Sequence, residues 1–308
     1  MAVQLVKVKE QDDGMRLNRW FLKYYPDLPL SRLQKLLRTK QIKVDGKKAE
    51  TNLKLESGQE IRIPPMEDKP KEQQKRKVSA KDAEFINSIV IYKDDNIIVL
   101  NKPSGIAVQG GTNTTRHIDG MLDALKFENE EAPKLVHRID KNTSGLLVLA
   151  RNRKYAEALT KGFKEHELPK TYLALVRGVP KKKSGEINAP LEKVGEKSIV
   201  VGDGKKAVSA YEVVDTVGER FSLVRVCPLT GRTHQIRAHM EYIGTPIVGD
   251  DRYFGDERKK YSILSDKLHL HSYKINLSSI YNAKMEIKAP LPDYFKQDLK
   301  EVGIQFKD

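Results

Sequence analysis

One segment of the chain places polar side chains inside apolar sequence. In LVHRIDKNTSGLLVLARN, residues 135–152, a strand-like apolar pattern is interrupted around His137, Arg138 and Asp140 and resumes past Gly145. A turn explains the Asn, Ser and Gly, but it does not explain an Arg and an Asp two residues apart. A carboxylate buried here needs a cation or a hydrogen-bond donor, because it otherwise takes up a proton. The segment therefore predicts a carboxylate site with a basic partner.

Two further segments are polar within apolar sequence. Tyr172 opens a strand in KTYLALVRG, and GRTHQIRAH predicts a short helix that Thr233 caps and Gly244 ends. The inward side of this helix consists of Ile236, Met240 and Ile243. Arg237 lies beside that side, within reach of a buried partner such as Asp140. Taken singly, these residues have ordinary explanations as a turn, a packing residue and a solvated arginine. Only the combination indicates a site.

Familiar cofactor and metal motifs are absent from the sequence. It contains no GxGxxG, GxxxxGK[ST], HExxH or CxxC, and HRID lacks the Gly-rich loop, DFG and metal-binding Asn of protein kinases. The seven His include the pairs His234/His239 and His269/His271, but no Cys or carboxylate pattern accompanies them. We therefore expect no metal and no cofactor.

The charge of the chain indicates a polyanionic partner. Its formal net charge is +14 and its pI is about 9.5, which is typical of nucleic-acid binding, although a basic protein without such a partner is the alternative. The single cysteine, Cys227, excludes an internal disulfide and fits a reducing compartment. No apolar run approaches the roughly 18 residues of a membrane span, and no signal peptide is recognisable. We expect a cytoplasmic protein without a membrane partner.

The larger part of the chain alternates strand-like and helix-like segments. The strand-like segments are NIIVLNKP, GLLVLAR, TYLALVRG, SAYEVVDT and FSLVRVCPL. Several are too closely spaced for a crossover helix at each step, which favours a mixed, largely antiparallel sheet. Apolar residues from Tyr155 to Phe163 follow helical spacing, which predicts a packed helix. The predicted fold class is α+β, with helices flanking the sheet and a small α/β module in front of it.

A charged segment separates two predicted domains. Residues 67–84, EDKPKEQQKRKVSAKDAE, hold almost no apolar side chains and predict a linker. The expected domains are therefore a module of residues 1–66 and a catalytic domain of residues 85–308.

The small module concentrates its positive charge on one helix and the adjacent hairpin. Leu33, Leu36 and Leu37 follow helical spacing, with Ser31 as a plausible N-cap. The candidate contacts to RNA phosphates are Arg32, Lys35, Arg38 and Lys43. A merely solvated basic face is the alternative.

From GMRLNRWFLKYYPDLPLSRLQKLL to LKLESGQEIRIPP, the module resembles the S4 RNA-binding domain. That family usually has Gly after the basic helix, whereas this chain has Lys40. A lysine at a position that needs positive φ carries strain, so the local turn is expected to differ.

Together the polar segments resemble the RluA family of RNA pseudouridine synthases. The resemblance rests on HRIDKNTSGLLVLARN, KTYLALVRG, GRTHQIRAHMEYIGTPIVGD and NKPSGIAVQGG, in the expected order and preceded by the S4-like module. Ile139 replaces the commoner Leu of HRLD, which conserves volume. Gln109 replaces a common His, which leaves the role of its loop in substrate choice open.

The resemblance implies roles for the polar residues. Asp140 would be the essential carboxylate, acting directly on the ribose or through a glycal-type intermediate. Tyr172 would stack on the target uracil and help to remove its C5 proton, and Arg237 would hold Asp140 ionised. Arg138 would fill the space of a flipped-out uridine. Within the same motifs, His137 and Arg232 are expected to contact RNA.

The implied activity is isomerisation of uridines in large-subunit (23S) ribosomal RNA, by a protein expected to be a monomer. A tRNA target is the alternative within this class. Outside it, the alternatives are an RNA-binding or ribosome-assembly factor without catalysis, and a metal-dependent nuclease or hydrolase.

Overall fold

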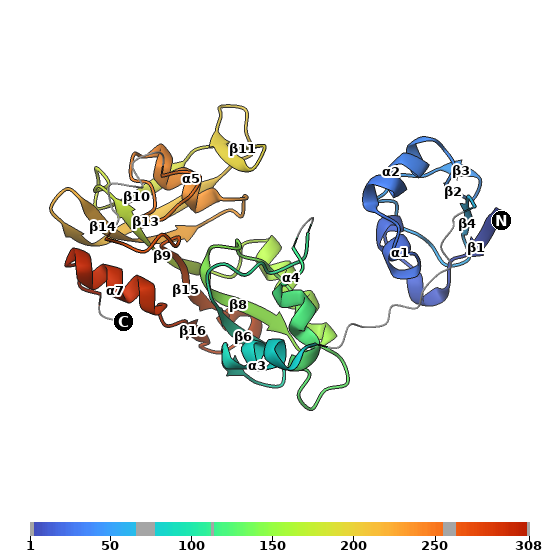
Figure 1. The fold of residues 1–308 in the computed structure, drawn as a ribbon, viewed down its shortest axis with the longest axis horizontal. Helices are drawn as coiled ribbons and strands as arrows, with labels where there is room; N and C mark the ends of the chain where they lie inside the picture. Colours follow the sequence, from blue (N-terminus) through green and yellow to red (C-terminus); the bar gives the residue numbers. More distant parts are fainter. Residues whose placement is uncertain (1–2, 66–77, 112–113, 255–262, 307–308) are drawn as a thin grey trace. The chain divides into compact units, whose positions relative to one another are not determined.

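The computed structural model describes residues 3–65, 78–111, 114–254 and 263–306. The chain divides into two compact units, Met1–Lys77 and Val78–Asp308, each with a hydrophobic core of its own (Figure 1). No helix in the described ranges is both long and apolar enough to cross a membrane.

The first unit combines two α-helices with a four-stranded antiparallel sheet in the order β1-β4-β2-β3. Its elements are β1 (Gln4–Lys7), a 3-10 turn η1 (Glu10–Asp12), α1 (Leu17–Tyr24), α2 (Leu30–Arg38), β2 (Lys43–Val44), β3 (Lys47–Lys48) and β4 (Glu60–Ile63). The strands are short, so most of the stability of this unit must come from the packing of the helices on the sheet.

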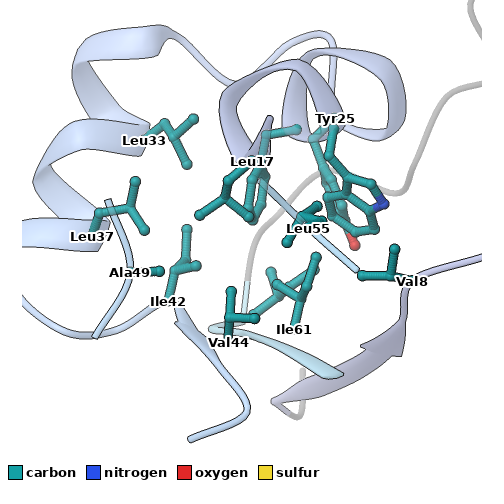
Figure 2. Close-up of a cluster of buried hydrophobic side chains, with 13 residues drawn as sticks. Val8, Leu17, Tyr25, Leu33, Leu37, Ile42, Val44, Ala49, Leu55 and Ile61 are labelled. Carbon is teal, nitrogen blue, oxygen red and sulfur yellow. The ribbon is translucent and has the colours of Figure 1, made fainter. Parts of the chain in front are cut away.

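Figure 2 shows the core of this unit, in which Leu33 and Leu37 of α2 meet Ile42, Val44 and other side chains from the sheet and α1. The opposite side of α2 is exposed and carries Arg32, Lys35 and Arg38, while Lys43 on β2 is half-buried. The predicted amphipathic helix is therefore confirmed. The predicted cap is wrong: the N-cap is Pro29 and Ser31 lies inside the helix, because the helix begins earlier than the polar residue suggested.

The lysine was expected to change the local turn, but Lys40 adopts the left-handed conformation, with φ 58°. The N–H groups of Lys40 and Gln41 donate to the carbonyl oxygens of Leu37 and Leu36 at 3.1 and 2.9 Å. These two bonds form the Schellman motif that satisfies the last carbonyls of α2. The position is usually glycine because a Cβ disfavours positive φ, so the lysine stores strain in the turn.

We predict that Lys40→Gly stabilises the first unit by about 0.5–1 kcal/mol, because relief of the left-handed strain exceeds the added chain entropy of glycine. Trp20, the single tryptophan, lies in the core of this unit, so its fluorescence during urea unfolding of the full chain reports on this unit. As control, Gln41→Gly should lower the urea midpoint, because Gln41 does not have a positive φ and glycine there only adds chain entropy to the unfolded state. An unchanged or lower midpoint for Lys40→Gly contradicts the prediction.

The second unit is built on a ten-stranded sheet with the main order β10-β13-β14-β9-β15-β8-β6-β5, in which β16 also pairs with β15 and β7 with β8. Its strands are β5 (Val90–Lys93), β6 (Ile97–Lys102), β7 (Lys134–Leu135), β8 (Ser144–Ala150), β9 (Lys170–Arg177), β10 (Ser184–Asn188), β13 (Val208–Val217), β14 (Phe221–Pro228), β15 (Leu270–Asn276) and β16 (Glu286–Lys288). Among the described strands only β8 and β15 pair in parallel. The predicted mixed, largely antiparallel sheet is confirmed.

Helices cover both faces of this sheet (Figure 1). They are α3 (Ala80–Ser88), η2 (Ile118–Leu125), α4 (Arg153–Lys164), α5 (Gln235–Tyr242), α6 (Ser278–Tyr281) and α7 (Asp293–Val302), and a separate hairpin consists of β11 (Leu191–Val194) and β12 (Lys197–Val200). Strand β9 shows how side chains alternate. Tyr172 and Ala174 pack with Ile236 of α5, whereas Leu173 packs with Phe295 of α7. The side chain of Tyr172 therefore lies on the α5 face.

The predicted linker is too long at its C-terminal end. Residues 66–77 lie outside the described residues, but Ser79 is the N-cap of α3 and its side chain accepts a hydrogen bond from the Asp82 backbone. Val78, one of the few apolar residues of this stretch, packs against the same core as Phe85 of α3. The second unit therefore includes residues that the charge pattern had assigned to the linker.

Candidate active site

The Asp140 loop, defined here as residues 136–143, connects β7 with β8. It ends where β8 approaches β15 closely: Gly145 has φ 103°, and a Cβ there would lie 2.2 Å from the carbonyl oxygen of Ser272. Ser272 pairs with Gly145 on one side and with Tyr172 of β9 on the other. The register of three strands therefore brings Tyr172 close to the end of the Asp140 loop.

The side chain of Lys102 fixes the backbone of the Asp140 loop by hydrogen bonds. It is fully buried at the end of β6, and its Nζ donates to the carbonyl oxygens of Pro103, Ile106 and Lys141, each at 2.9 Å. Burial lowers the pKa of Lys102 to about 7, opposed by the charge of Asp140. Three carbonyl acceptors match the three N–H groups of an ammonium, which favours the charged form. The sequence had marked the segment NKPSG without assigning this role.

The Asp140 carboxylate is 29% exposed and stands apart from its basic neighbours. Arg237 Nη1 and His234 Nε2 each lie 3.9 Å from its Oδ2. Within the described part of the chain, its carboxylate oxygens accept no hydrogen bond. A carboxylate held near a guanidinium and an imidazole but hydrogen-bonded to neither remains available to a substrate.

Arg237 is held mainly by a different carboxylate from the one predicted. Its Nε and Nη2 donate to the two oxygens of buried Asp250, both at 2.7 Å, and Nη2 also reaches Asp251 at 3.2 Å. The predicted charge-assisted pair with Asp140 is present only as a long ion pair, with Nη1 3.9 Å from Oδ2, because Asp250 accepts the hydrogen bonds of Nε and Nη2. Burial lowers the pKa of Arg237, but Asp250 and the other carboxylates raise it overall, so the side chain stays charged.

Helix α5 begins with strained backbone. Its N-cap is His234, in the left-handed conformation with φ 52° and ψ 21°, and no side chain caps the helix. The predicted cap by Thr233 is therefore wrong. The apolar residues Ile236 and Met240 are buried as expected, and the helix ends before Gly244, which has φ 81°.

Two cavities meet at Asp140. One, of about 180 Å³, has Tyr172, Ile236 and Leu270 among its lining residues and also reaches Arg138 and Arg232. The other, of about 320 Å³, is lined by polar side chains that include Gln109, Lys141, Asn142 and Arg252. Asp140, Arg138, His234 and Arg237 border both cavities. The first can receive a flat, partly apolar group and the second a charged one.

Two of the predicted RNA contacts in this unit lie where expected and one does not. Arg138 and Arg232 are exposed at the cavity. His137 instead accepts a hydrogen bond at its Nε2 from the Val148 backbone at 2.8 Å and stacks on Phe163. Burial lowers the pKa of His137 to about 3, with Lys170 adding to this effect, so the ring is neutral. His137 fixes the loop to β8, and its geometry does not support a contact with RNA.

Tyr172 is buried beside the cavity. Burial raises the pKa of its phenol to about 12, and the charge of Asp140 acts in the same direction, although a hydrogen bond with Ser272 opposes it. The ring can therefore serve as an apolar wall, whereas its phenolate form is rare at neutral pH. In the described ranges, no group of three or more His, Cys, Asp or Glu side chains could hold a metal ion.

Comparison with known proteins identifies the class. A family model described as RNA pseudouridylate synthase matches residues 96–242, which include Asp140, Tyr172 and Arg237. The human protein RNA pseudouridylate synthase domain containing 4 has a similar structure, with a TM-score of 0.63 and 25% identity over 73% of this chain and 97% of that one. The chain belongs to the RNA pseudouridylate synthase family, whose members are isomerases.

Similarity over nearly the full length narrows this class to the RluA family. The chain is 37% identical to ribosomal large subunit pseudouridine synthase C, RluC, of Rickettsia conorii, over 92% of this chain and 96% of that protein. It is 33% identical to the protein of the same name from Escherichia coli O157:H7, over 98% of this chain and 97% of that protein. The resemblance found in the motifs is thus confirmed, with RluC as the type of synthase to which the chain is similar.

We predict that Asp250→Asn destabilises the second unit by about 3 kcal/mol and lowers activity, because it leaves the buried Arg237 without its charged partner and frees Nη1 from its place near Asp140. Calorimetric unfolding of the full chain measures the first effect. Asp251→Asn is the matched control: its side chain is 45% exposed, so the loss should stay below about 1 kcal/mol. Equal losses for the two variants would contradict the assignment.

Proposed function

We propose that this protein converts uridines of large-subunit ribosomal RNA to pseudouridine and that Asp140 is the carboxylate that acts at C1′ of the target nucleotide. The observation that carries the proposal is the position of Asp140, a carboxylate without a hydrogen bond from the described residues. It lies beside an apolar-walled cavity, with Arg237 and His234 each 3.9 Å from its Oδ2. The family supplies the reaction, and the relatives named RluC supply the class of RNA.

The reaction needs one carboxylate and no cofactor. The N1–C1′ bond breaks, the base turns, a C5–C1′ bond forms, the C5 proton leaves, and N1 gains a proton. Glycosidases pair a carboxylate with a second one to direct water at the sugar, but here water must not intercept the detached base. A single carboxylate whose surroundings exclude water suits this requirement.

The smaller cavity is the proposed site of the uracil ring. Tyr172, Ile236 and Leu270 provide apolar contact to a flat ring, and Asp140 lies at the same cavity, where the ribose would lie. A stacked uridine must leave its helix to reach this site, at a cost of a few kcal/mol. Exposed Arg138 at the cavity is the proposed group that occupies the vacated space, since a guanidinium stacks on bases and pairs with phosphates.

The first unit is proposed to be an S4-like second contact to the same RNA, as its sequence resemblance implies. Its exposed basic side chains Arg32, Lys35 and Arg38 project from one side of α2. A tethered second contact raises the effective concentration of RNA at the active site without taking part in the chemistry.

We predict that Asp140→Asn lowers the rate of tritium release from uridine C5 by about 10³-fold or more, because an amide can neither attack the sugar nor accept its proton. The substrate is large-subunit rRNA transcript labelled with tritium at C5, without added cofactor. Asp203→Asn, the same exchange at an exposed position, should retain full activity. Release at the normal rate from the Asp140 variant would refute the role of this carboxylate, and no release by the unaltered protein would refute the proposed function.

We also predict that replacing Arg32, Lys35 and Arg38 together by Gln weakens rRNA binding and leaves the single-turnover rate at saturating RNA unchanged. Each lost phosphate contact should reduce the slope of log affinity against log salt by about 0.7–0.9. The control replaces three other exposed cations, Lys284, Lys296 and Lys300, by Gln. Equal slopes for the two variants would contradict a specific contact by α2.

A further inference from the structure

An imidazole lies at the reaction centre without an assigned role. His234 Nε2 is 3.9 Å from Asp140 Oδ2, its side chain is 12% exposed, and the residue borders both cavities. In the sequence, His234 was noted only together with His239, as a pair of possible metal ligands. The described ranges contain no group of three or more His, Cys, Asp or Glu side chains that could hold a metal ion. Proton transfer is the chemistry that a single imidazole can perform here.

The hydrogen bonds around His234 define which nitrogen is free. Its Nδ1 lies 3.2 Å from the hydroxyl of Tyr253. That hydroxyl donates its single hydrogen to the carbonyl of Ser198 at 3.1 Å and accepts from the Ser198 N–H at 2.7 Å. Nδ1 is therefore the donor toward Tyr253, and in the neutral ring Nε2 carries a lone pair. Among the described residues, Nε2 has no hydrogen-bond partner, and it faces Asp140.

The backbone holds this arrangement against its own preference. With φ 52°, His234 is in the left-handed region, which costs a residue with a Cβ roughly 1 kcal/mol or more. Both neighbours are fixed, because the Ser198 hydroxyl donates to the Thr233 carbonyl at 2.7 Å and the Gln235 amide donates to Val208 and Ser209 at 2.9 Å. Strain maintained by the surroundings at a cavity is typical of functional residues.

The proposed reaction requires a base at this place. When C5 has bonded to C1′, it lies one bond from the carbon on which Asp140 acts, so its proton leaves within a few ångströms of that carboxylate. Arg237 cannot accept a proton. Tyr172 is a phenol at neutral pH, because burial raises its pKa to about 12. Of the side chains beside Asp140, the free lone pair of His234 is the one suited to the task.

We propose that His234 is the catalytic base that removes the C5 proton of the target uracil, an inference that rests on the proposed function. The C5–H bond breaks and its proton passes to Nε2, its electron pair forms C5=C6, and the C6=N1 pair moves to N1. N1 then takes a proton from the imidazolium or from water, which returns His234 to the neutral form. The imidazolium formed in between is stabilised by Asp140.

The electrostatics of the site keep His234 ready to accept a proton. Burial lowers its pKa, Arg237 and Arg252 lower it further, and Asp140 and Asp250 oppose them. These groups and the Tyr253 hydroxyl are the titratable or charged groups that face the ring. The imidazole is consequently neutral at pH 7. The rate of C5 proton loss should fall as the pH drops through the lowered pKa, because protonation removes the lone pair.

The test compares His234→Asn with the unaltered protein on rRNA transcripts that carry hydrogen or deuterium at uridine C5, in single turnover. Asn tolerates the left-handed backbone, and its amide can donate to Tyr253 as Nδ1 does, but it has nothing in place of Nε2. We expect C5 release to slow by about 10²–10⁴-fold. We also expect the deuterium isotope effect to rise and the acidic limb of the pH profile to disappear.

Two comparisons make the outcome decisive. His166→Asn is the same exchange at an exposed histidine with φ 61° and should retain the normal rate and isotope effect. His234→Gly fits the positive φ, and added imidazole should restore C5 release in it, which keeps the test informative if the Asn variant unfolds. Normal release and an unchanged isotope effect in His234→Asn, or no rescue of His234→Gly by imidazole, would overturn the proposal in favour of Asp140 as its own base. Failure of the unaltered protein to release C5 hydrogen would instead refute the proposed function.

Discussion

The proposed chemistry depends on a carboxylate that stays charged and yet accepts no direct hydrogen bond from the protein. Asp140 needs positive charge nearby, but a guanidinium bonded directly to it would block the ribose of the proposed substrate. In the structure, Nε and Nη2 of Arg237 donate to Asp250, so that only Nη1 faces Asp140, at 3.9 Å from its Oδ2. Asp250 itself accepts backbone N–H groups of Arg252 and Tyr253, which fixes the turn that carries it. The charge of Asp140 is thus stabilised at a distance by the buried pair of Arg237 and Asp250.

The same principle applies to the backbone around Asp140. Lys102 bonds three carbonyl oxygens, one of them from Lys141 next to the carboxylate, and Ser104 donates to the carbonyl of Asn142 at 2.7 Å. A cation at the end of β6 and a hydroxyl two residues after it therefore fix the backbone that follows Asp140. The loop is held through main-chain atoms, which leaves its side chains Arg138 and Asp140 free to meet RNA.

Much of this molecule could be predicted from its sequence, and the limits have physical reasons. Five strands, the packed helix from Arg153 and the amphipathic helix α2 follow from local patterns of period 2 and 3.6. The residues around the cavity were recognisable because polar side chains interrupt apolar runs. The S4 likeness and the catalytic roles remain predictions.

The features that could not be predicted from the sequence depend on contacts between residues that are distant in the chain. The spacing of Arg237 and Asp250 in the sequence does not suggest that they pair. A local pattern also does not show which of two carboxylates accepts the hydrogen bonds of a guanidinium. The strain at His234 and the burial of Lys102 likewise arise from segments that meet only in the folded chain. Strand β15 is absent from the predicted strands, and its His271 is buried and lies 2.9 Å from the Ser144 hydroxyl of β8.

The position of β15 has a consequence for how the molecule comes into being. This strand is among the last to leave the ribosome, yet it lies between β9 and β8 in the sheet. Strand β8 is synthesised more than a hundred residues earlier. Until residues 270–276 arrive, Gly145 and Tyr172 lack the strand that sets their spacing. Long-range pairing of this kind slows folding, because chain entropy is lost before the contacts form. A nascent chain therefore carries its basic N-terminal unit into solution well before β15 can fix the positions of Gly145 and Tyr172.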